Sequence, residues 1–85
     1  MIGRVFEILD EVCSNEHFRD ECSKLRVMLD VLEDVREEFG SFGFSAGLRM
    51  LVGLVGEMID KATGLGLKKE LDLLIEARLR VLACL

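Results

Sequence analysis

The residue types in this chain that could bind a metal or act as nucleophiles are its three cysteines and its single histidine. Cys13, His17 and Cys22 follow one another in the spacing C-x3-H-x4-C, and Cys84 lies near the other end of the chain. Three thiolates and one imidazole would satisfy the tetrahedral geometry that zinc prefers. Cys13 and Cys22 also lie on apolar stripes, where reduced cysteine packs as a small hydrophobic residue. The sequence leaves both interpretations open.

Motifs for catalysis are absent from the sequence. It contains no GxxxxGK[ST] loop, no HExxH and no paired CxxC. A Cys–His nucleophile pair built from Cys13 or Cys22 with His17 would lack a third group to orient the histidine and a pocket for an oxyanion. We therefore expect a protein that is not an enzyme and that needs no cofactor, zinc being the alternative.

The charge distribution argues against nucleic acid as a partner. The net charge is −5, and Lys68-Lys69 is the one adjacent basic pair, whereas binding to phosphates requires concentrated positive charge. Carboxylates gather instead within residues 30–38, on one side of an expected helix. They form either a solvated face or a surface for a hard cation or a basic partner. This acidic cluster comprises Asp30, Glu33, Asp34, Glu37 and Glu38.

The sequence also predicts a cytoplasmic protein that does not enter the membrane. A membrane span needs about 20 consecutive apolar residues, and the best candidate, residues 48–59, is interrupted by Arg49 and Glu57. The first residues lack the apolar core of a signal peptide. Three scattered cysteines are too few for a disulfide framework and suit a reducing compartment. The chain has no Gln, only one Asn and many Glu and Arg, a composition that resembles that of thermophile proteins.

Apolar residues recur every three or four positions, which predicts an all-α fold, with the chain (1–85) forming one compact bundle of about four helices. Ser14 or Asn15 can cap the second helix, and Gly40 can end it in a left-handed conformation. Residues 40–47 are expected to form a connector and residues 63–66 a short turn. The four expected helices are residues 2–13, 16–39, 46–62 and 67–83.

Several residues do not fit a core in which each of the four helices buries one apolar stripe. Val27 and Val31 lie outside the main stripe of the second helix. Gly53 and Gly56 interrupt a helix that is apolar on nearly every side, and each costs about 1 kcal/mol relative to Ala. They would either admit a helix of another subunit or relieve crowding inside the bundle. Arg78 falls within the apolar stripe of the last helix, so it is either a buried charge with an acidic partner or a side chain that extends to water. The other members of this stripe are Leu67, Leu71, Leu74, Ile75, Leu82 and Leu85.

The apolar content is high for so short a chain. Hydrophobic residues make up 51% of the chain, and there are eight glycines besides. In an average domain, hydrophobic residues and glycine together make up roughly 45–50%, so this chain lies above that range. A small domain has little interior in which to bury this excess. We therefore expect a protein-interaction module, either a homodimer or a small subunit that docks on another protein.

Three segments resemble the C-terminal helical lid of McrB-type AAA ATPases, a resemblance that covers residues 25–85. LDVLEDVREEFGSFGF (29–44) resembles the helix and aromatic-glycine connector that open the lid. GLRMLVGLV (47–55) resembles the helix that follows, and ELDLLIEARLRVLACL (70–85) the closing helix, with Ala83 where Pro is expected. The resemblance implies a helical lid in which Arg49 would face a nucleotide. No P-loop precedes these segments, so the corresponding alternative function is a detached lid domain.

Overall fold

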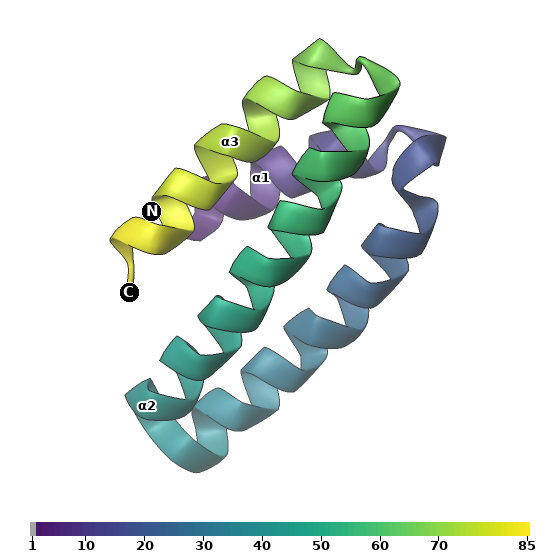
Figure 1. Ribbon diagram of the computed structural model, residues 1–85. Helices are drawn as coiled ribbons and strands as arrows, with labels where there is room; N and C mark the ends of the chain where they lie inside the picture. The colour runs from purple at the N-terminus through teal and green to yellow at the C-terminus, as the bar shows by residue number, and fades with distance from the viewer. Residues whose placement is uncertain (1) are drawn as a thin grey trace.

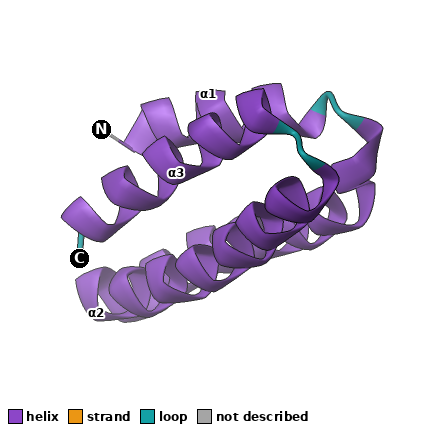
Figure 2. Ribbon diagram, turned by 45° about the horizontal axis from the view of Figure 1, so that its top comes forward, coloured by secondary structure: helices purple, strands orange, loops and turns teal. Residues whose placement is uncertain are grey.

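The computed structural model describes the backbone of residues 2–85 and their side chains outside positions 2, 33, 35–39 and 41–43. In chain order the elements are α1 (Ile2–Cys13), the 3-10 helix η1 (Glu16–Phe18), α2 (Arg19–Leu65) and α3 (Lys68–Ala83). Figure 2 shows α1 and α3 side by side in one layer above α2. No strand occurs within residues 2–85, and the prediction of an all-α bundle is confirmed.

Helix α2 folds back on itself at Gly40 (Figure 1). The backbone of Gly40 is non-helical, with φ 63° and ψ −145°. Glycine adopts a positive φ readily because it has no Cβ atom. A straight helix of 47 residues would be about 70 Å long, whereas the longest dimension of the molecule is 40 Å. Residues 19–39 and 41–65 thus form two neighbouring arms, which we call the first and second arms of α2.

This reversal confirms the prediction that Gly40 ends one helix, but the predicted connector over residues 40–47 was wrong. Residues 41–47 are helical, because the single positive-φ residue turns the chain without a loop. The small and polar residues in this segment resembled a loop in the sequence. The four expected helices therefore correspond to α1, the two arms of α2 and α3.

Backbone and side-chain caps define the other helix boundaries. The Asn15 side chain accepts a hydrogen bond from the His17 N–H at 2.9 Å and caps η1, as its position predicted. After α2, Gly66 adopts a left-handed conformation with φ 69° and ψ 27°. The Leu67 N–H donates to the Ala62 carbonyl and the Gly66 N–H to that of Thr63, the pair of bonds that makes a Schellman motif. The predicted turn thus lies at residues 66–67, slightly later than expected.

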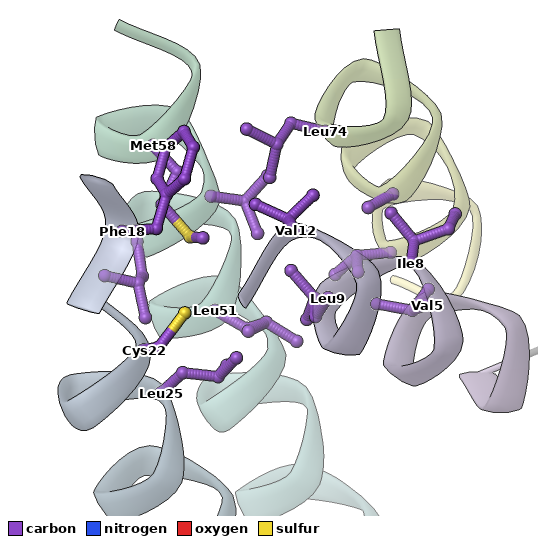
Figure 3. Close-up of a cluster of buried hydrophobic side chains, with 14 of the residues drawn as sticks. Val5, Ile8, Leu9, Val12, Phe18, Cys22, Leu25, Leu51, Met58 and Leu74 are labelled. Atoms are coloured by element: carbon purple, nitrogen blue, oxygen red, sulfur yellow. The ribbon is translucent and has the colours of Figure 1, made fainter. Parts of the chain in front are cut away.

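A continuous apolar core lies between the α1–α3 layer and the arms of α2. Figure 3 shows Phe18 of η1 directed toward Met58 of the second arm, while Val12 and Leu74 meet beside them. All four side chains are fully buried. Because α1 has its apolar residues at the spacing of one helical face, it buries four of them in this core. The α1 contribution is Val5, Ile8, Leu9 and Val12.

The two arms of α2 approach one another closely at Gly47. A Cβ atom built on Gly47 would overlap the side chain of Leu32, which is buried. Gly47→Ala should therefore destabilise the fold, because overpacking costs about 1–3 kcal/mol and outweighs the helix-propensity gain of about 1 kcal/mol. Urea denaturation measures this change in the free energy of unfolding.

The same substitution in a Leu32→Ala background provides the control. Once the Leu32 side chain is removed, Gly47→Ala has space and should stabilise the protein, so that the two changes are strongly non-additive. A Gly47→Ala variant that is stabilised in both backgrounds would show that the arms are not in contact at this point.

Candidate interaction surface

An apolar groove runs along the two arms of α2. Val27, Val31 and Met50 are large hydrophobic residues whose exposed fractions are 64%, 47% and 58%. We call this surface the α2 groove, because both arms contribute to it. Its lining residues are Ser23, Lys24, Val27, Met28, Val31 and Met50. The prediction that Val27 and Val31 lie outside the core of the chain agrees with this exposure.

Helical phase explains why these residues face outward. In the first arm Cys22, Leu25 and Leu32 are buried, and Val27 and Val31 fall one helical turn apart on the flank of that stripe. In the second arm Met50 directly precedes the buried Leu51, a step of about 100° around the helix. The first arm therefore leaves Val27 and Val31 in water beside its buried stripe, and the second arm leaves Met50.

The end of the α2 groove near the start of the first arm carries opposite charges. Lys24 Nζ lies 3.9 Å from Glu57 Oε2 of the second arm, and both side chains are exposed. Such an exposed pair contributes little to stability. Toward the other end, Asp34 is also exposed, and it lies on the same helical face as Lys24, Val27 and Val31 because these four recur every three or four residues.

Gly53 and Gly56 have open surroundings. A Cβ atom built on either residue would meet nothing within 4 Å. The interpretation that they relieve crowding inside the bundle was therefore wrong, since no neighbouring helix approaches them within the described chain. Gly53 is exposed and lies one turn after Met50, beside the α2 groove. The alternative, that these glycines admit a helix of another subunit, stays a prediction.

Helix α3 presents a second exposed apolar surface. Leu79 is 61% exposed, and Leu82 and Leu85 are about half exposed, although the sequence analysis placed Leu82 and Leu85 in the core stripe. The predicted stripe was correct for Leu74, which is buried, and for Leu67 and Leu71, which pack against the core. It was wrong for Leu82 and Leu85, because Ala77 and Val81 continue the buried stripe instead. Met50 did not stand out in the sequence, where its only signal was the apolar character of the second arm on nearly every side.

Cys13 and Cys22 form a disulfide whose Cα atoms are 5.9 Å apart. The expectation of reduced cysteines was therefore wrong for this pair, because the turn through η1 brings the end of α1 beside the start of α2 within disulfide distance. Cys84 has a free thiol and follows α3, at the opposite end of the bundle (Figure 1). His17 is exposed.

The four residues considered as zinc ligands are thus not brought together in this arrangement. A disulfide supplies no thiolate, and thiolate is the form of cysteine that binds zinc. Across residues 2–85, where side chains are described, no group of three or more His, Cys, Asp or Glu residues is placed to hold a metal ion.

The other charged residues that the sequence singled out are exposed or partly exposed. Arg78 is partly exposed, and the part of the chain that is described buries no charged side chain. The prediction of a buried charge was wrong, because a long guanidinium side chain reaches water from a position beside the core. Arg49 is exposed, as are Asp30 and Asp34 of the acidic cluster. The side chains of Glu33, Glu37 and Glu38 lie outside the described residues.

Ion pairs tie the elements together around the core. The Glu76 Oε2 atom of α3 accepts hydrogen bonds from Arg4 Nε of α1 at 3.1 Å and from Arg80 Nε at 2.9 Å. These bonds from Arg4 and Arg80 hold the pKa of Glu76 below its usual value, and Glu76 in turn raises the pKa of Arg4.

A second ion pair joins the two arms of α2. Lys61 of the second arm donates to Glu21 and to the His17 carbonyl, both at 2.9 Å. Burial alone would raise the pKa of Glu21, but the Lys61 hydrogen bond lowers it.

The lowered pKa of Glu76 predicts how stability depends on pH. A carboxyl whose pKa is lower in the folded than in the unfolded chain stabilises the fold above its unfolded pKa, and this contribution is lost as pH falls through the folded pKa. Glu76→Gln should therefore lower the melting temperature at neutral pH and converge with the parent protein at about pH 2. Asp72→Asn, which removes an exposed carboxylate of α3, is the control and should not show this convergence. A constant difference between Glu76→Gln and the parent at every pH would contradict the assignment.

Comparison with protein-family models, curated proteins and solved structures finds no match to this chain. Among residues 2–85, none of the helices combines the length and the apolar content that a membrane span requires. The observation most relevant to function is therefore the geometry of the exposed apolar surface itself.

Proposed function

We propose that this chain is a non-enzymatic protein-interaction module that forms a two-fold homodimer through the α2 groove. The observation that supports the proposal is the joining of Val27, Val31 and Met50 into one exposed apolar groove on the outer side of α2. Exposed apolar side chains that adjoin one another, rather than lie singly, are typical of interaction sites. The absence of catalytic motifs in the sequence favours this class over an enzyme.

The arrangement of residues along the first arm favours a second copy of the chain as the occupant. In a two-fold dimer, residue i of one subunit contacts residue j of the other, and j contacts i. Two first arms that cross antiparallel between Val27 and Val31 place each valine opposite the other valine of the second copy. The same register places Lys24 opposite Asp34 at both ends of the crossing. In this register the first arm thus pairs apolar residues with apolar residues and a basic residue with an acidic one.

A pair of matched substitutions tests this proposal. Val27→Asp introduces a charge into the α2 groove, whereas Leu79→Asp makes the same kind of change at a residue of nearly equal exposure on α3. Because desolvating an unpaired carboxylate at an interface is costly, Val27→Asp should give a monomer, and Leu79→Asp should remain a dimer. Size-exclusion chromatography with light scattering measures the mass of each variant.

Both variants should keep the helical fold, because both positions are exposed in the single chain. Circular dichroism of each variant checks this. A Leu79→Asp monomer together with a Val27→Asp dimer would move the interface to α3. A parent protein that is monomeric throughout would refute the homodimer and leave another protein as the partner of the groove.

A further inference from the structure

The Cys13–Cys22 disulfide lies on a polar pocket at the junction of α1, η1 and α2. Both cysteines line this pocket, together with Glu16, Arg19 and Arg26. Arg19 lies three residues before Cys22 and Arg26 four residues after it, so all three share one face of the first arm. The disulfide bond is therefore reached from solvent through a surface that carries two guanidinium groups and one carboxylate.

The two cysteine residues are not equally exposed. Cys22 is buried, with 7% of its surface exposed, whereas Cys13 is partly exposed. An incoming thiolate would therefore reach the Cys13 Sγ atom, and Cys22 would be the leaving group. Cys22 lies in the first turn of α2, which begins at Arg19. Arg19 and Arg26 favour a thiolate on Cys22, whereas its apolar surroundings in the core and the acidic Asp20 and Glu21 of the same turn oppose it, so the exposure of Cys13 and the two arginines of the pocket carry the argument.

We infer that Cys13–Cys22 is an exchange-active disulfide that reacts with small thiols carrying carboxylates, the chemical class of glutathione. Arg19 and Arg26 attract the carboxylates and so raise the local concentration of the thiol at Cys13. This inference rests on the pocket and on the unequal exposure of the two cysteine residues, and it does not depend on dimerisation through the α2 groove.

The exchange proceeds in two balanced steps. The thiolate sulfur of the small molecule attacks Cys13 Sγ, the Cys13–Cys22 bond breaks, and its electron pair leaves on Cys22 Sγ, which takes a proton from water. A second thiolate attacks the small-molecule sulfur of the mixed disulfide and releases Cys13 as a thiolate. The products are two reduced cysteines and one symmetric disulfide of the small thiol, so two electrons pass to the protein.

Reduction of the oxidised protein by three thiols tests the inference. Glutathione carries carboxylates, 2-mercaptoethanol is neutral and cysteamine is cationic, and all three are compared at equal thiolate concentration. The reaction is stopped by alkylation and followed by intact-mass spectrometry. Glutathione should open the disulfide about tenfold faster than cysteamine. In an Arg19→Ser/Arg26→Ser variant the three rates should converge, whereas Arg49→Ser, which removes an exposed arginine of the second arm, should leave the difference unchanged.

The site of attack is tested with Cys22→Ala and Cys13→Ala, both in a Cys84→Ala background that removes the other free thiol. Oxidised glutathione should modify Cys13 in the first variant faster than it modifies Cys22 in the second. Equal rates for the three thiols in the parent protein would overturn the inference. So would a rate that does not depend on thiol concentration, since exchange would then require unfolding, or a first adduct of the parent protein on Cys22.

Discussion

Replacing Cys13 and Cys22 together by alanine is expected to lower the free energy of unfolding by about 2–3 kcal/mol. The disulfide joins residues nine positions apart and restricts the unfolded chain around η1, and a domain of 85 residues has little other stability in reserve. For a domain of this size the loss corresponds to a decrease in melting temperature of roughly 10–20 °C. Thermal and urea denaturation under oxidising conditions measure it.

Two comparisons isolate the contribution of the disulfide from other effects of the substitutions. The parent protein in excess reductant should melt at nearly the same temperature as the double variant. Cys84→Ala removes the free, partly exposed cysteine and should leave the melting temperature almost unchanged. A double variant as stable as the oxidised parent, or a parent protein that reductant does not affect, would show that Cys13 and Cys22 are not bonded in solution.

The second large effect is expected at Gly53. In the single chain a side chain at Gly53 meets open space, so Gly53→Leu should keep the fold and add about 0.8 kcal/mol of helix propensity. In the proposed dimer, Gly53 would lie beside the α2 groove where the second copy approaches. The added side chain should oppose this contact by about 1–3 kcal/mol, which raises the dimer dissociation constant roughly 5- to 150-fold. Analytical ultracentrifugation over a concentration series measures this constant.

Gly64→Leu is the matched control for this prediction. Gly64 also lies in the second arm of α2, and a Cβ atom there also meets nothing within 4 Å. It is about three helical turns beyond Gly53 and away from the α2 groove. Gly64→Leu should gain the same helix propensity and retain the dimer. Equal dissociation constants for Gly53→Leu and the parent protein would show that no chain packs beside Gly53.

Local patterns in the sequence predicted most of the fold. The repeat of apolar residues every three or four positions identified α1, both arms of α2 and α3, because a helix in a small bundle must bury one face. The turn residues Asn15 and Gly40 lie where the predicted boundaries placed them, since an N-cap side chain and a positive φ are properties of single residues. Val27 and Val31 stood out because they do not fit the core stripe of their own helix.

The features that the sequence did not predict depend on how the elements pack. The Cys13–Cys22 disulfide requires the path of the chain through η1, which spacing alone does not define. The exposure of Leu82 and Arg78 depends on the rotation of α3 against α2, and a modest change of phase moves residues at the stripe edge between core and surface. Met50 joins the groove only because the two arms lie side by side. Each of these features is set by tertiary contacts rather than by local sequence.

The most direct test of self-association is the mass of the parent protein in solution, combined with its melting temperature across a wide range of protein concentration. A homodimer would give a particle of two chains of 9.6 kDa and a melting temperature that rises with protein concentration, because association stabilises the folded subunits. A monodisperse particle of one chain whose melting temperature does not change with concentration would contradict it.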